Sequence, residues 1–132
     1  MLVLTPCVGR DDVLDRLRLL LSNNRWVTLT GAPGCGKTLV ARHTASAAGA
    51  VVWVAGHHHA TTESLVTACL DALDAEVAPG DSPTMALKRA LDGRDTLLVL
   101  DGVDALEGLG EILNNLVEES ESWRLLCTAT TV

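Results

Sequence analysis

The stretch Gly31-Ala32-Pro33-Gly34-Cys35-Gly36-Lys37-Thr38 decides the fold of this 132-residue chain. It follows a short apolar run at residues 26–29 and opens an alanine-rich segment, residues 37–48, that suits a helix. A strand, a glycine loop and a helix in that order place the loop at the positive end of the helix. Glycines also allow several backbone N–H groups to converge on one anion. The stretch therefore predicts a phosphate-binding loop between a buried strand and a helix.

The same eight residues match GxxxxGK[ST], the Walker A motif of nucleotide-binding proteins. We expect the Lys37 ammonium to reach the β- and γ-phosphates of a nucleotide and the Thr38 hydroxyl to bind Mg²⁺. An accidental glycine-rich turn is the alternative, and the flanking strand and helix argue against it. The predicted nucleotide-binding residues here are Gly31, Ala32, Pro33, Gly34, Cys35, Gly36, Lys37, Thr38 and Leu39.

A second apolar run, residues 97–100, ends in Asp101, as in a Walker B motif. We expect Asp101 to hold Mg²⁺ through water, so Thr38 and Asp101 are the predicted metal residues. Asp104 follows three residues later and is a candidate to orient an attacking water. The predicted catalytic residues are thus Lys37, Asp101 and Asp104. Either aspartate can instead cap a helix, an alternative that is stronger for Asp104.

Four short apolar runs alternate with segments of helical periodicity, which is typical of strands buried in a parallel sheet. Because strands separated by helices connect in parallel, the pattern predicts a three-layer α/β fold of the P-loop NTPase class, with its ligand at the carboxyl ends of the strands. The expected strands are residues 26–29, 51–54, 97–100 and 123–127, and the expected helices are residues 11–21, 37–48, 65–73, 82–93 and 106–117.

The sequence favours ATP over GTP, because a complete strand separates the two Walker motifs and no NKxD-like guanine-reading motif is present. The net charge of −7 and the scattered basic residues disfavour direct nucleic-acid binding by this segment. No apolar stretch approaches the ~20 residues that span a bilayer, and no secretory signal is recognisable. We expect one cytoplasmic domain, residues 1–132, whose four cysteines are reduced thiols.

With these motifs in place, the chain resembles the N-terminal part of a STAND-type ATPase module, the group that includes NB-ARC domains and the ATPase part of LuxR/AfsR-type regulators. Val8-Gly9-Arg10-Asp11 resembles the VGR(E/D) motif at the start of such modules, and residues 97–104 resemble their Walker B segment. The resemblance implies that Val8, Gly9 and Arg10 contact the base and the rest of the nucleotide. It also implies an ATP- or ADP-operated switch that controls contacts with other domains of a larger signalling or transcription-regulating protein.

Two positions depart from the family pattern. Residues 125–128 resemble the strand that senses the γ-phosphate, which implies a nucleotide contact for Thr128, but Thr130 stands where an arginine is common. Gly102 replaces the acidic residue that directly follows the Walker B aspartate in many relatives. We therefore expect slow or absent hydrolysis in isolation. A small-molecule kinase and a degenerate protein-interaction module are the alternative functions.

The resemblance further implies a strand order of first, fourth, third, second, written 1-4-3-2 by position along the chain. In that order a fifth strand normally covers the outer side of the first, and the chain ends before supplying it, so we expect a fragment of a larger protein. The first strand would then be an open edge, for which residues 2–4 are the only spare apolar run. An open apolar edge predicts self-association or a poorly ordered phosphate loop.

Overall fold

The fold is described from a computed structural model of the chain. It describes residues 2–4, 10–31, 36–47, 49–56, 61–103, 108–118, 120 and 122–130. Strands and helices alternate along these residues, as the apolar runs and helical periodicities of the sequence predict.

The described strands form one parallel sheet in the order β1-β2-β5-β4-β3. Their bounds are β1 Leu2–Leu4, β2 Trp26–Thr30, β3 Ala50–Ala55, β4 Thr96–Asp101 and β5 Arg124–Ala129. The three inner strands are almost completely covered, since every residue of β4 is buried and all residues of β2 and β5 after the first are buried. Burial on both faces explains why these strands read as continuous apolar runs and do not alternate with polar residues.

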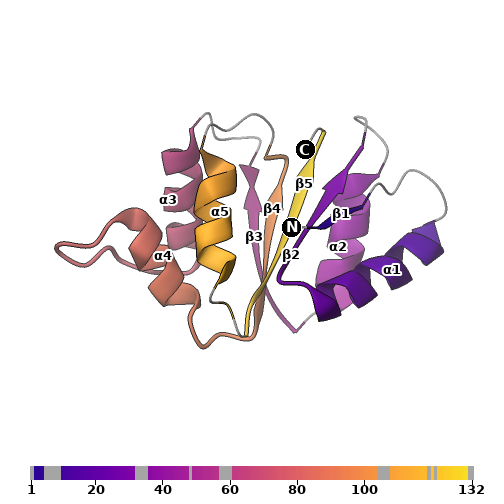
Figure 1. The fold of residues 1–132 in the computed structure, drawn as a ribbon, viewed down its shortest axis with the longest axis horizontal. Helices are drawn as coiled ribbons and strands as arrows, with labels where there is room; N and C mark the ends of the chain where they lie inside the picture. The colour runs from indigo at the N-terminus through magenta and orange to yellow at the C-terminus, as the bar shows by residue number, and fades with distance from the viewer. Residues whose placement is uncertain are drawn as a thin grey trace.

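Helices cover both faces of the sheet (Figure 1). They are α1 Arg10–Asn23, α2 Lys37–Ala47, α3 Thr62–Ala72, α4 Pro83–Leu91 and α5 Leu109–Glu118. Along β4 the side chains alternate between two cores: Leu98 and Leu100 pack with α3, α4 and α5, whereas Leu97 and Val99 pack with α1 and α2. This period of two follows from the pleat of a strand, and it produces the three-layer architecture that the sequence predicts.

The predicted 1-4-3-2 order is confirmed by β2, β5, β4 and β3, which lie side by side in that sequence. The prediction of an open edge at the first of these strands is wrong. β1 pairs in parallel with β2, with Leu2 opposite Val27 and Leu4 opposite Leu29. Three residues are enough to pair with the backbone in the middle of β2. The strand that leads into the glycine loop therefore has a neighbouring strand on each side. The edge argument for self-association therefore fails.

The ends of the helices follow local capping chemistry. α4 begins where expected, because the Ser82 hydroxyl accepts a hydrogen bond from the Met85 N–H at 3.2 Å and Pro83 occupies the first turn. It ends at Leu91, two residues before Gly93, whose φ of 78° only glycine adopts readily. No helix in the described part of the chain combines the length and apolar character needed to cross a membrane.

Candidate nucleotide-binding site

The site is assembled at the carboxyl ends of three adjacent strands. Gly31 directly follows β2, and α2 begins at Lys37. Asp101 is the last residue of β4, and the register of the sheet places Thr128 of β5 opposite it. Because the strands are parallel, their carboxyl ends meet at one edge, which brings Thr38, Asp101 and Thr128 together although they are far apart in sequence.

Two hydroxyl groups hold the carboxylate of Asp101. The Thr38 hydroxyl donates to Oδ1 at 3.0 Å and lies 3.3 Å from Oδ2. The Thr128 hydroxyl donates to Oδ1 at 2.6 Å. Asp101 is buried, with 7% of its surface exposed, so these charge-assisted bonds compensate for the water that the carboxylate has lost. Thr38 and Asp101, the two residues predicted to hold the metal, are thus in direct contact.

The chain turns immediately after Asp101. Gly102 has a φ of 78°, in the left-handed region. Its N–H points at Thr128, 2.8 Å from the hydroxyl oxygen and 3.0 Å from the carbonyl oxygen. The Val103 N–H donates to the same carbonyl at 3.0 Å. These hydrogen bonds hold the turn against β5. A side chain at Gly102, the first residue of the turn, would strain its left-handed backbone.

A glycine at the end of β3 allows that strand to pack closely against the turn after Asp101. Gly56 directly follows β3, and a Cβ atom added there would lie 2.6 Å from Cγ1 of Val103. It would also lie 3.2 Å and 3.3 Å from the carbonyl oxygens of Asp101 and Gly102. Only a residue without a side chain fits at this distance, so Gly56 lets the end of β3 approach the segment that carries the carboxylate. Sequence reasoning did not identify Gly56, because the requirement arises from strands that meet only in the sheet.

On the helix side, Lys37 lies over the start of the loop. Its Nζ donates to the carbonyl oxygen of Gly31 at 2.5 Å. A cavity of about 400 Å³ lies alongside, lined by Gly36, Lys37, Thr38, Leu39 and Arg42. Arg42 is an addition to the predicted set. Its guanidinium carbon is 5.2 Å from the centroid of the Trp53 ring, a cation–π distance, and its place one helical turn after Thr38 is the sequence signal that could have identified it.

The residues that meet at this edge fit magnesium and a polyphosphate. A hydroxyl and a carboxylate are the hard oxygen ligands that Mg²⁺ prefers, and Thr38 and Asp101 supply one of each within hydrogen-bond distance. The ammonium of Lys37, at the first turn of α2, provides positive charge beside the N–H groups of the helix end.

Several predicted site residues cannot be placed. Arg10 is the first residue of α1, and only its backbone is described. The others lie outside the described residues: Val8, Gly9, Ala32, Pro33, Gly34, Cys35 and Asp104. Their roles stay predictions, as does the expectation of a poorly ordered phosphate loop.

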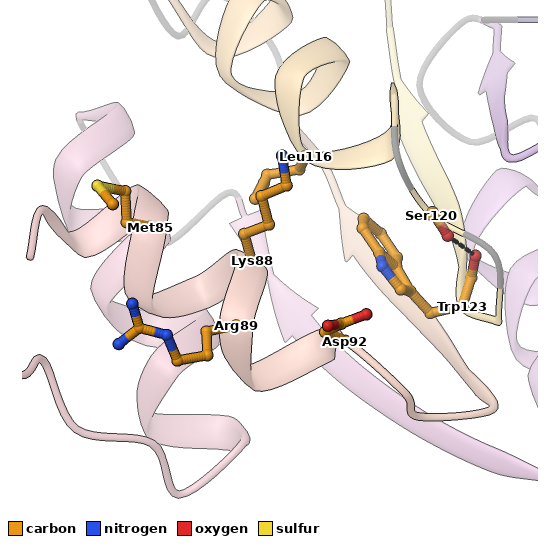
Figure 2. Close-up of a pocket in the computed structure, with 7 residues that line it drawn as sticks. All are labelled: Met85, Lys88, Arg89, Asp92, Leu116, Ser120 and Trp123. Carbon is orange, nitrogen blue, oxygen red and sulfur yellow. Dashed lines mark hydrogen bonds between the residues drawn. The ribbon is translucent and has the colours of Figure 1, made fainter.

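A separate hollow lies on the side of the sheet that α4 and α5 cover (Figure 2). It measures about 300 Å³ and lies between α4, α5 and the segment before β5, with Lys88, Asp92 and Trp123 among its walls. The Ser120 hydroxyl closes one side by donating to the carbonyl oxygen of Trp123. None of the described residues that line it is a glycine, whereas Gly36 lines the cavity beside Lys37.

The chain is similar to bacterial and archaeal proteins. It is 32% identical over 137 residues to the uncharacterized protein Rv0894 of Mycobacterium tuberculosis and to the uncharacterized protein Mb0918 of Mycobacterium bovis, with 96% of this chain and 34% of each relative covered. The chain thus spans about a third of the length of these relatives. It is also 51% identical over 63 residues to the gas vesicle ATPase GvpN2 of Halobacterium salinarum, covering 47% of this chain and 18% of that protein.

Among solved structures, the fold is similar to that of Cdc6p from Pyrobaculum aerophilum. The TM-score is 0.72 at 21% identity, over 95% of this chain and 40% of that one, which supports the fold alone. Residues 6–128 match the AAA ATPase domain, a span that includes the glycine loop, Asp101 and Thr128. With that match over almost the whole sequence, and with the P-loop sheet order and the Thr38–Asp101 contact beside it, the chain belongs to the AAA ATPase domain family.

Proposed function

We propose that residues 1–132 form a single domain that binds ATP or ADP with Mg²⁺ and acts as a nucleotide-operated switch within a larger protein. One observation carries the proposal: the Thr38 hydroxyl and the Asp101 carboxylate lie 3.0 Å apart where the carboxyl ends of the central strands meet the start of α2. A serine or threonine of the glycine loop and an aspartate at a strand end are the pair that P-loop enzymes use for their metal.

In this proposal each residue has a defined task. Lys37 leaves the carbonyl of Gly31 and pairs with the β- and γ-phosphates, since an anionic oxygen is a stronger acceptor for an ammonium than a carbonyl is. Thr38 and Asp101 hold Mg²⁺, which when bound neutralises phosphate charge. The backbone of the loop, residues 31–36, surrounds the polyphosphate, and Val8, Gly9 and Arg10 contact the base.

Hydrolysis is slow in this proposal because Gly102, the residue directly after Asp101, has no acidic side chain. At the position of Gly102, many members of the STAND group that the sequence resembles have an acidic side chain, but here the backbone is left-handed and hydrogen-bonded to Thr128. Asp104 is then the remaining acidic candidate for orienting water. We expect the purified chain to bind ATP yet turn it over far more slowly than once per second. Steady turnover of several ATP per second, measured as phosphate release, would contradict the switch and favour an enzyme.

The finer assignment, a STAND-type module of a signalling or transcription-regulating protein, rests on the motif at residues 8–11. Relatives about three times as long as this chain are consistent with further domains as its partners. A small-molecule kinase has less support, because Arg124 is the only basic residue after Asp101 and a kinase lid needs arginines. Arg124 lies at the start of β5, away from the site, with its Nε donating to the carbonyl of Leu21 at 3.2 Å.

Calorimetric titration with ATP and ADP, with Mg²⁺ and with EDTA, tests the proposal. We expect Lys37→Ala to weaken nucleotide binding strongly in every condition, because its ammonium acts on the phosphates. Asp101→Asn should reduce mainly the Mg²⁺-dependent part. Lys88→Ala and Asp95→Asn are the matched controls, one lysine on α4 and one aspartate directly before β4, both outside the candidate site.

Unchanged ATP affinity in Lys37→Ala would refute the assignment of the loop. An equal loss with Mg²⁺ and with EDTA in Asp101→Asn would make that carboxylate a structural group.

A further inference from the structure

The Thr128 hydroxyl donates its one proton to a protein group. A threonine hydroxyl has one proton to donate and two lone pairs that accept. Thr128 uses its proton on Oδ1 of Asp101 at 2.6 Å, and it accepts from the N–H of Gly102 at 2.8 Å. A phosphate oxygen can only accept, so Thr128 cannot bond to a γ-phosphate while it donates to Asp101.

The sheet also fixes where this hydroxyl lies. Thr128 is 1% exposed and sits in the strand between β2 and β4, opposite Leu29 on one side and Asp101 on the other. A β-branched side chain on a central strand has few alternative χ1 rotamers. Rotation of the hydroxyl away from Asp101 would leave Oδ1 with only the longer bond from Thr38.

The bonds to Asp101 are unequal, and this sets the orientation of the carboxylate. Oδ1 accepts two hydroxyl protons, at 2.6 Å and 3.0 Å. Oδ2 accepts, among the described residues, only a contact of 3.3 Å from Thr38. The oxygen with the greater remaining capacity to accept is therefore Oδ2, and it is the one suited to a metal-bound water.

We propose that Thr128 is a positioning residue for the metal site: it holds Oδ1 of Asp101 so that Oδ2 is directed at Mg²⁺, and it does not contact the γ-phosphate. The inference rests on the proposed function, because it needs a nucleotide bound with Mg²⁺. It replaces the phosphate contact that the family resemblance implies for Thr128 with an action through Asp101.

The comparison of ATP with ADP separates the two roles, because ADP has no γ-phosphate. Thr128→Val keeps the shape of the side chain and removes the hydroxyl, while the Gly102 N–H keeps the Thr128 carbonyl as an acceptor. We expect this variant to lose affinity roughly ten-fold for both ATP and ADP in Mg²⁺, as loss of an outer-sphere partner of a metal ligand commonly does. Affinities in EDTA should stay within about two-fold of wild type. Thr128→Ser should restore Mg²⁺-dependent affinity.

Two further variants exclude a merely structural effect. Thr96→Val removes another buried strand hydroxyl, at the far end of β4, and should leave all four affinities unchanged. In an Asp101→Asn background, Thr128→Val should add no further loss. If Thr128→Val fails to fold, Thr128→Ala and Thr128→Ser carry the same comparison.

A loss confined to ATP would overturn the inference and restore γ-phosphate sensing. Equal losses with Mg²⁺ and EDTA would also overturn it. A wild-type chain that binds no nucleotide, with Lys37→Ala indistinguishable from it, would refute the proposed function itself.

Discussion

Replacement of Gly102 by alanine measures what the turn after the carboxylate contributes. At a φ of 78° a Cβ costs about 1–2 kcal/mol, because it approaches the following carbonyl oxygen. Alanine also restricts the unfolded chain, which offsets about 0.4–1 kcal/mol. The turn cannot relax to negative φ cheaply, since its two N–H groups are bonded to Thr128. A net destabilisation of about 1 kcal/mol follows, which lowers the melting temperature by roughly 3 °C.

Gly93→Ala is a control for this substitution, because Gly93 has the same φ of 78° and its added Cβ meets no atom within 4 Å. We expect the two variants to lose similar free energies of unfolding in urea denaturation. They should differ in binding. Strain at Gly102 acts on the N–H that bonds to the Thr128 hydroxyl, so Gly102→Ala should weaken Mg²⁺-nucleotide binding several-fold, whereas Gly93→Ala should not change it.

Three results would contradict this reasoning. If Gly102→Ala is as stable as wild type while Gly93→Ala is not, the left-handed turn is not a requirement of the site. If both variants bind Mg²⁺-nucleotide as wild type does, the turn is structural only. If Gly102→Glu hydrolyses ATP rapidly and is as stable as wild type, the left-handed backbone is not the reason that position 102 lacks an acidic residue.

Gly56→Ala should destabilise the fold by about 1–3 kcal/mol in urea denaturation, because its Cβ would lie 2.6 Å from Val103 and close to two backbone carbonyls. Val103→Ala in the same chain should recover part of that loss, and no recovery would mean that the carbonyls are the obstacle. Burial raises the pKa of the Cys69 and Cys127 thiols to about 12 from a reference of 9.0. Since the unfolded chain releases these protons first, the free energy of unfolding should fall between about pH 9 and pH 12, and below pH 9 this contribution is constant. In the native protein both thiols should resist iodoacetamide at pH 8, as read by peptide mass spectrometry, and rapid labelling would show that the core opens.

The fold could be predicted because its signals are local. Continuous apolar runs identify buried strands, and the Ser82-Pro83 pair identifies the start of a helix. The strand order came from a resemblance, and the sheet confirms it. What the sequence did not reveal depends on groups that meet only in three dimensions. The sequence predicted an open edge at the strand of residues 26–29, but Leu2–Leu4 pairs with it through the backbone.

The candidate site also contains some residues that sequence motifs predicted and some features that only the three-dimensional structure reveals. Thr38 and Asp101 were predicted from motifs, and the sheet brings them into contact. Gly102 was noticed as a missing acid, but its left-handed turn could not be read from one letter. The hydrogen bond from Thr128 to Asp101 could not be predicted either, because it depends on the register between β4 and β5. A shift of one residue would turn the Thr128 hydroxyl to the other face of the sheet.

The central position of β5 has a consequence for how the protein is made. β5 pairs with both β2 and β4, and Trp26 lies opposite Leu125, although most of the chain separates these two residues in the sequence. A sheet whose central strand is synthesised after its neighbours has a high contact order, which slows folding. The apolar edges of β2 and β4 therefore stay unpaired until β5 has been synthesised. Thr38, Asp101 and Thr128 meet only once β5 has inserted, so a growing chain on the ribosome should assemble its proposed metal site in one late step, after residue 128 has left the exit tunnel.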